Sequence, residues 1–167
     1  MTSQTRSPTE GQLADKLPGL TAYITGHKSD NGDTTIQEKR PAKWRSIDSG
    51  GMTFHEVFTT SEFPVSFNDD VDIKKHDERV NSGKMGIVNP RGTVLRFVDF
   101  SPGFESMMHR TKSLDYGIVV EGAIELILDS GEKQILQRGD PVEVQGKPLK
   151  EYLGRSEGEI PPSGNDE

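Results

Sequence analysis

The sequence predicts an all-β fold in which short antiparallel strands form a barrel or a sandwich. Between residues 20 and 145, runs rich in β-branched and aromatic residues alternate with Gly, Pro, Asn and Asp turn residues. The densest part, residues 101–145, contains tight turns at 129–132 and 138–140 that join neighbouring runs. Because closing a sheet or packing two sheets protects strand edges, this spacing favours a jelly roll.

The first part of the domain is predicted to contain four strands and one short helix. The strands are expected at residues 20–27, 34–38, 52–60 and 93–100. Residues 39–51 are expected to form a loop held by Trp44, because a lone tryptophan is usually buried. A helix over 70–80 has a thin apolar face and is interpreted as a surface excursion, with His76 solvated between two charged neighbours.

The strand over 52–60 carries the first candidate pocket residue. Alternation places Phe54 and Phe58 on one face and His55 and Thr59 on the other. His55 is either an ordinary, partly buried histidine or part of a substrate pocket, to which Phe97 also contributes.

The central block supplies the remaining strands and sets the expected boundaries. Strands are predicted at 105–111, 116–120, 123–128, 133–137 and 142–144. With 167 residues and 31% apolar content, the chain suits one compact domain with polar peripheral segments. We expect a flexible arm over 1–17, a β domain over 18–145 with its core at 93–145, and a polar, disordered tail over 146–167.

Charge and composition exclude several classes of function. A formal net charge of -7 argues against a nucleic-acid partner, because such binding depends on neutralising phosphates with Lys and Arg. The absence of cysteine excludes disulfides and thiolate chemistry and leaves His, Asp and Glu as the main metal ligands. No run approaches the ~20 apolar residues that span a bilayer, and the N-terminus lacks a signal core. We therefore expect a cytoplasmic protein without a membrane partner.

Five positions in the central block carry a resemblance to a known family. Gly103, His109, Thr111, Asp115 and Gly122 have the spacing of the first cupin motif, whose metal-binding form has Gly, His, His, Glu and Gly there. Thr111 thus stands at the second histidine and Asp115 at the glutamate. Residues 108–122 are also similar to small cupins of fungal secondary-metabolite gene clusters. These include the cupin-domain oxidoreductases that accompany polyketide synthases making salicylaldehyde-type products.

The resemblance implies a cupin-like jelly roll that tailors a small aromatic or polyketide intermediate. It implies a small-molecule substrate, other enzymes of the same pathway as partners, and a homodimer. A second cupin motif should follow Gly139 with a Pro-x-Gly turn and a later histidine, yet no histidine follows His109. Either the barrel closes differently, for example across a dimer, or it is incomplete at its C-terminus and the chain is an inactive truncated form.

His109 and Asp115 are the candidate metal ligands and the candidate catalytic pair. A divalent metal (Fe, Mn, Ni or Zn) usually takes three protein ligands, so this set is incomplete and would need His55 or a substrate oxygen. Without metal, a histidine oriented by a carboxylate is a general acid or base for enolisation, dehydration or isomerisation, with Thr111 lining the pocket. Oxidoreductase or decarboxylase chemistry stays open.

A non-catalytic interpretation stands beside the catalytic one. His109 then hydrogen-bonds within the barrel mouth and Asp115 caps a turn with Ser113, in a cupin that binds a small molecule or supports a partner enzyme. Arg110 and Lys112 alternate with the candidate pair and are expected to face solvent.

Overall fold

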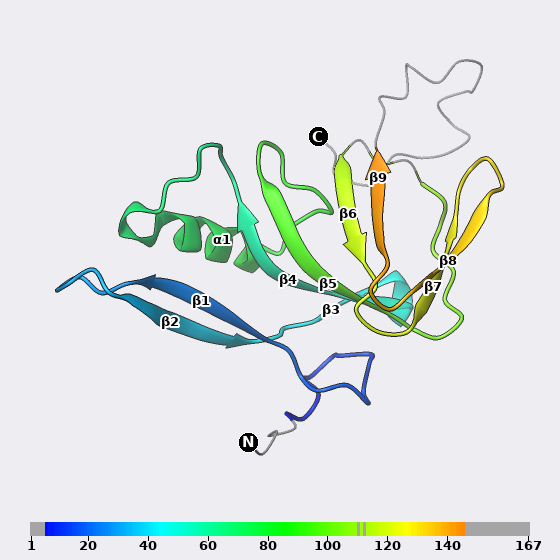
Figure 1. The fold of residues 1–167 in the computed structure, drawn as a ribbon, viewed down its shortest axis with the longest axis horizontal. Helices are drawn as coiled ribbons and strands as arrows, with labels where there is room; N and C mark the ends of the chain where they lie inside the picture. The colour runs from blue at the N-terminus through cyan, green and yellow to red at the C-terminus, as the bar shows by residue number, and fades with distance from the viewer. Residues whose placement is uncertain (1–5, 110, 112, 146–167) are drawn as a thin grey trace. The chain divides into compact units, whose positions relative to one another are not determined.

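The described part of the chain is mostly β, and there it has several small antiparallel sheets and one α-helix (Figure 1). The computed structural model describes residues 6–109, 111 and 113–145. The strands there are β1 (Thr21–His27), β2 (Thr34–Pro41), β3 (Arg45–Ile47), β4 (Met52–Thr60), β5 (Thr93–Phe100), β6 (Leu114–Ile118), β7 (Ala123–Ile127), β8 (Lys133–Gln137) and β9 (Pro141–Gln145). The helices are η1 (Asp48–Gly50), η2 (Asn68–Asp70) and α1 (Val71–Asn81). The β-rich class predicted from the sequence is confirmed.

The described residues form two compact units. The first contains the residues up to Met85 together with Asn89–Glu105, and the second contains Gly86–Val88 and the residues from Ser106 onward. The predicted boundaries at 17 and 145 stay predictions. Residues 146–167, Arg110 and Lys112 lie outside the described residues, as do the predictions made for them. In the part of the chain that is described, no helix has the length and apolar character needed to cross a membrane.

The first unit is built around the antiparallel sheet β3-β4-β5. β4 carries a bulge between Glu56 and Phe58, where two of its residues oppose a single step of β5. Phe58 therefore pairs with Leu95, whereas Phe54 pairs with Val98, so the two phenylalanines belong to opposite faces. The strict alternation predicted for this strand is wrong beyond the bulge, because one inserted residue reverses every later side chain.

Helix α1 packs on β4 and buries a histidine (Figure 1). Ile73 and His76 are three residues apart, so they share one side of the helix, and both are buried. The prediction that His76 is solvated is wrong, since His76 is only 4% exposed. Its charged neighbours Lys75 and Asp77 instead bond to Glu62 and Arg40. Helical period, and not the charge of adjacent residues, decides which side chain meets the sheet.

Two further segments of the first unit attach to this core. The β1-β2 hairpin is joined to α1 by two hydrogen bonds from the Arg40 guanidinium to the Asp77 carboxylate, 2.5 and 3.0 Å long. Residues 6–19 are held by the indole Nε1 of Trp44, which donates to Thr9 Oγ1 at 2.8 Å, and by Ala14 N, which donates to Asp99 Oδ2 of β5 at 3.1 Å. Trp44 is half-buried, and the segment that it fastens is residues 6–19, whereas the prediction had it hold the loop over 39–51. The predicted loop over 39–51 nevertheless contains β3, which pairs with β4.

The strands of the second unit form two antiparallel pairs, one nested inside the other along the sequence. β7 pairs with β8, while β6 and β9, which flank them in sequence, pair with each other. Backbone hydrogen bonds of Val119 with Asp140 and Gly139 join the two arms between the pairs. Gly122 and Gly139 adopt positive φ angles of 82° and 94°, which allow the chain to turn there without the penalty of a Cβ. The unit is therefore one long hairpin that bends near Val119 (Figure 1).

The four strands predicted here correspond to β6 to β9, and Lys133–Gln137 has the predicted bounds. The predicted strand over 105–111 is wrong, because the described residues of this segment pair with no strand in the described chain. The mixture of apolar and polar residues in 105–111 is compatible with an extended backbone. A β-strand, however, also needs a neighbouring strand to pair with.

Candidate functional site

The segment that matches the first cupin motif is exposed and locally hydrogen-bonded. The His109 ring is exposed, and its Nδ1 lies 3.1 Å from the carbonyl oxygen of Met107. A carbonyl can only accept, so this contact assigns the proton to Nδ1 and leaves Nε2 as the acceptor. Gly103 and Gly122, the two motif glycines, have φ angles of 73° and 82°. They occupy the left-handed conformation that glycine adopts most readily.

The other two motif residues are connected through a serine. Thr111 Oγ1 lies 2.7 Å from Ser113 Oγ, and Ser113 Oγ donates to Asp115 Oδ1 at 2.7 Å. The hydrogen bond between Ser113 and Asp115 is the contact that the non-catalytic interpretation expected. The structure thus links Thr111 with Asp115, while the hydrogen bond of the His109 ring is to Met107.

This donor set does not fit a three-ligand metal site. It contains one imidazole, one carboxylate that already accepts from Ser113, and one neutral hydroxyl. Among the described residues, no three His, Cys, Asp or Glu side chains are grouped so that they could hold a metal ion. The expectation that His55 completes the ligand set stays a prediction. We therefore derive no step through a metal.

His55 and Phe97 are direct neighbours in the first unit. They lie opposite each other on β4 and β5. His55 is 6% exposed, its ring lies 5.7 Å from that of Trp44, and it hydrogen-bonds the backbone of Lys43. Burial lowers the pKa of His55, and the bond to Lys43 and the charge of Glu56 only partly oppose this effect. Burial thus disfavours the charged form of His55, and its place in a substrate pocket stays a prediction.

His76 is a second buried histidine, which the sequence predicted to be solvated. His76 Nδ1 lies 3.2 Å from Thr59 Oγ1, and the ring stacks on Phe58 with centroids 4.9 Å apart. Thr59 is 1% exposed. Burial also lowers the pKa of His76. The sequence signal for its burial is the spacing of three residues from Ile73, which puts both side chains on the same side of the helix.

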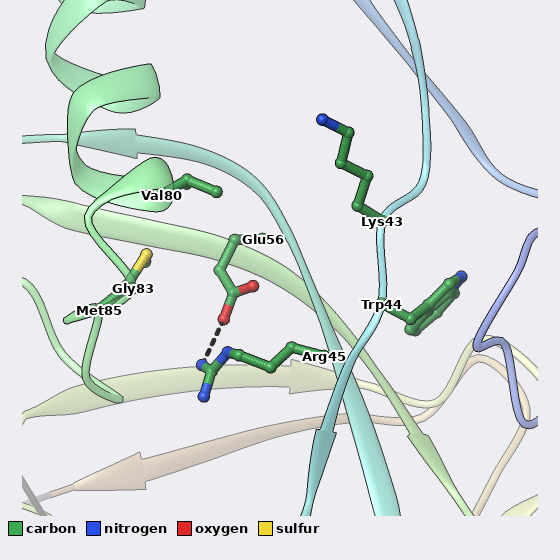
Figure 2. A pocket seen from close by; sticks show the side chains of 7 residues that line it. All are labelled: Lys43, Trp44, Arg45, Glu56, Val80, Gly83 and Met85. Atoms are coloured by element: carbon green, nitrogen blue, oxygen red, sulfur yellow. Dashed lines mark hydrogen bonds and ion pairs between the residues drawn. The ribbon is translucent and has the colours of Figure 1, made fainter.

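A pocket of about 200 Å³ lies in the first unit between β3, β4 and the end of α1 (Figure 2). It is lined by Lys43, Trp44, Arg45, Glu56, Val80, Gly83 and Met85. The Glu56 side chain is 7% exposed and accepts from Arg45 Nη2 at 2.9 Å. Arg96 Nη2 approaches the same carboxylate at 3.7 Å.

The guanidinium groups around Glu56 share an aromatic support. Arg45 and Arg96 lie over the Phe54 ring at 5.7 and 4.6 Å from its centroid, within cation–π distance. Sequence reasoning missed this group, because residues 39–51 were expected to be a loop. The signal that could have revealed it is the opposite charge of Glu56 and Arg96 on two neighbouring strands.

Comparison with known proteins identifies the family. No family model matches the chain. The cupin-domain-containing oxidoreductase virC of Hypocrea virens is 39% identical over 152 residues, 84% of this chain and 76% of the relative. The oryzines biosynthesis cluster protein J of Aspergillus oryzae is 38% identical over 134 residues, 78% of this chain and 73% of the relative.

A third relative, the cupin-domain-containing oxidoreductase srdD of Neurospora crassa, is 46% identical over 127 residues, 76% of this chain. The chain spans 63% of its length, less than two thirds. These similarities relate the chain to fungal cupin-domain proteins and to a biosynthesis cluster protein. The chain belongs to the fungal cupin-domain-containing oxidoreductases, which confirms the resemblance inferred from residues 103–122.

Proposed function

We propose that this protein tailors a small aromatic or polyketide intermediate in fungal secondary-metabolite biosynthesis. The observation that carries the proposal is the 39% identity with an oxidoreductase over 84% of this chain. The name of the oryzines cluster protein J, a second relative, points to the same kind of pathway. The proposed setting is the cytoplasm, with a small-molecule substrate, enzymes of the same pathway as partners, and a homodimer.

A jelly roll is the proposed architecture of the β domain. In the sequence, the paired strands β7 and β8 lie between β6 and β9, which pair with each other. A long hairpin that is folded over has this nested pairing. Jelly rolls are built from such hairpins.

The proposed chemistry is proton transfer by His109 and Asp115, with Thr111 lining the substrate pocket. His109 is exposed, and its protonated Nδ1 leaves Nε2 able to take a proton next to a substrate carbonyl. Ser113 orients the Asp115 carboxylate by donating to Oδ1. The oxidoreductase class comes from the names of the relatives, and proton transfer is the part of such chemistry that these side chains supply.

A non-catalytic binding or accessory role is the second candidate. It is favoured by the separate local bonds of the pair, since the His109 ring is bonded to Met107 and Asp115 to Ser113. In this case the segment is a structural turn and another part of the protein binds the small molecule or the partner enzyme.

Gene deletion with metabolite profiling distinguishes these functions. Deletion is expected to remove a product or accumulate an intermediate, and complementation with the unmodified gene to restore the profile. Under the catalytic proposal His109→Gln and Asp115→Asn fail to restore it, whereas His27→Gln, at another exposed histidine, succeeds. Restoration by all three variants supports the accessory role. A deletion that changes no metabolite contradicts both.

A further inference from the structure

The pocket beside Glu56 combines a cationic rim with an apolar wall. Lys43 is exposed and the Arg45 side chain is 48% exposed, so both cations reach solvent. The buried Glu56 carboxylate lies within ion-pair distance of both Arg45 and Arg96. Val80 and Met85, from the end of α1 and the segment after it, supply the apolar side (Figure 2).

The charges of this pocket favour an anion. Among the residues that line the pocket, Lys43 and Arg45 carry positive charge and Glu56 alone carries negative charge, in a chain whose formal net charge is -7. Arg96, outside the lining, approaches the Glu56 carboxylate at 3.7 Å. Arg45 binds Glu56 through Nη2, and a guanidinium offers five N–H donors in a fork that suits carboxylates. Phe54 holds the Arg45 guanidinium by cation–π contact, which preorganises it for a ligand.

Size and lining restrict the ligand further. About 200 Å³ is below the ~300–1,000 Å³ typical of sites for drug-sized ligands, so the occupant is of one-ring size. Met85 is a polarisable side chain that makes favourable contacts with aromatic rings. An inorganic anion would leave Val80 and Met85 without an apolar partner.

We propose that this pocket binds a small aromatic or unsaturated carboxylic acid as its anion. The carboxylate of the ligand pairs with Lys43 and Arg45, and its apolar body lies against Val80 and Met85. This binding site is separate from residues 103–122 and does not depend on the proposed role of His109.

Methionine methyl resonances provide a local test. The chain has five methionines, of which Met85 lines the pocket while Met107 and Met108 lie next to His109. The protein labelled with ¹³C at its methionine methyl groups is titrated with benzoate, with the neutral isostere benzamide, and with inorganic phosphate. Benzoate is expected to shift the Met85 resonance saturably and to bind at least about tenfold more tightly than benzamide, as expected for loss of a charge-assisted pair.

Charge-removing variants assign the effect to the rim. Arg45→Gln is expected to raise the apparent Kd for benzoate about tenfold, and Lys43→Gln several-fold. Arg138→Gln removes the same charge from the second unit and is expected to leave the Kd unchanged. Lys43 is exposed, so Lys43→Gln is expected to fold normally. It tests the cationic rim even if Arg45→Gln does not fold.

Several results would overturn the proposal. These are an unmoved Met85 resonance at millimolar benzoate, equal binding of benzamide, and equal binding of phosphate, which would indicate a site for inorganic anions. Shifts of Met107 and Met108 in place of Met85 would also overturn it, while supporting a ligand site at the cupin motif. Failure of this inference is therefore distinguishable from failure of the proposed function.

Discussion

Replacing His76 with glutamine is expected to flatten the acid side of the stability profile. His76 is 4% exposed, and burial lowers its pKa below the ordinary value of 6.5. The charges of Asp77 and Glu56 raise this pKa and those of Arg40 and His55 lower it, but burial is the largest effect. His76 therefore binds a proton less readily in the folded protein than in the unfolded chain.

The sign and size follow from proton linkage. Between the lowered pKa and 6.5 the unfolded state binds more protons, so the free energy of unfolding rises with pH. The contribution is fully present above pH 6.5 and is lost as the pH falls towards the native pKa. One such histidine changes the free energy of unfolding by at most about 1.4 kcal/mol per pH unit. His76 and His55 together change it by at most about 2.7 kcal/mol per pH unit.

The measurement is urea unfolding between about pH 5 and pH 7.5. His76→Gln loses the stacking on Phe58 and rearranges the bond to Thr59, so it is about 1–3 kcal/mol less stable at the upper pH. This difference narrows towards pH 5, because the variant has lost one titrating group. His27→Gln, at an exposed histidine, keeps the slope of the unmodified protein. Equal slopes for His76→Gln and the unmodified protein would refute the reasoning.

Three further substitutions test the first unit. Phe54→Ala removes a core ring that is 7% exposed and supports two guanidinium groups, and it is expected to cost about 3–5 kcal/mol in chemical unfolding; a loss below 1 kcal/mol would contradict its core position. Gly92→Ala places a Cβ against the Thr60 carbonyl oxygen and is expected to cost about 1–3 kcal/mol, whereas an unchanged Tm would show that the backbone of Thr60 does not approach Gly92 closely. Trp44→Phe removes the indole donor to Thr9 and is expected to accelerate hydrogen exchange in residues 6–19 but not in β8; uniform acceleration would indicate general destabilisation.

The candidate site shows where sequence reasoning was sufficient. The spacing from Gly103 to Gly122 identified the family that the relatives confirm, since a motif depends on local offsets. The same reasoning did not find the pocket beside Glu56. Its lining runs from Lys43 to Met85 and meets only when β3, β4 and α1 pack together.

The sequence by itself determined the local pattern of this protein. Strand-forming runs and turn glycines specified β6 to β9, and the thin apolar face of Val71, Ile73 and Val80 indicated the helix over residues 70–80, because both signals lie within a few residues of the chain. Only the tertiary structure decided which faces are buried. The bulge in β4 reversed the positions of Phe58 and Thr59, and packing of α1 on β4 buried His76 despite its charged neighbours. Burial and pairing depend on partners distant in the chain, which no local pattern contains.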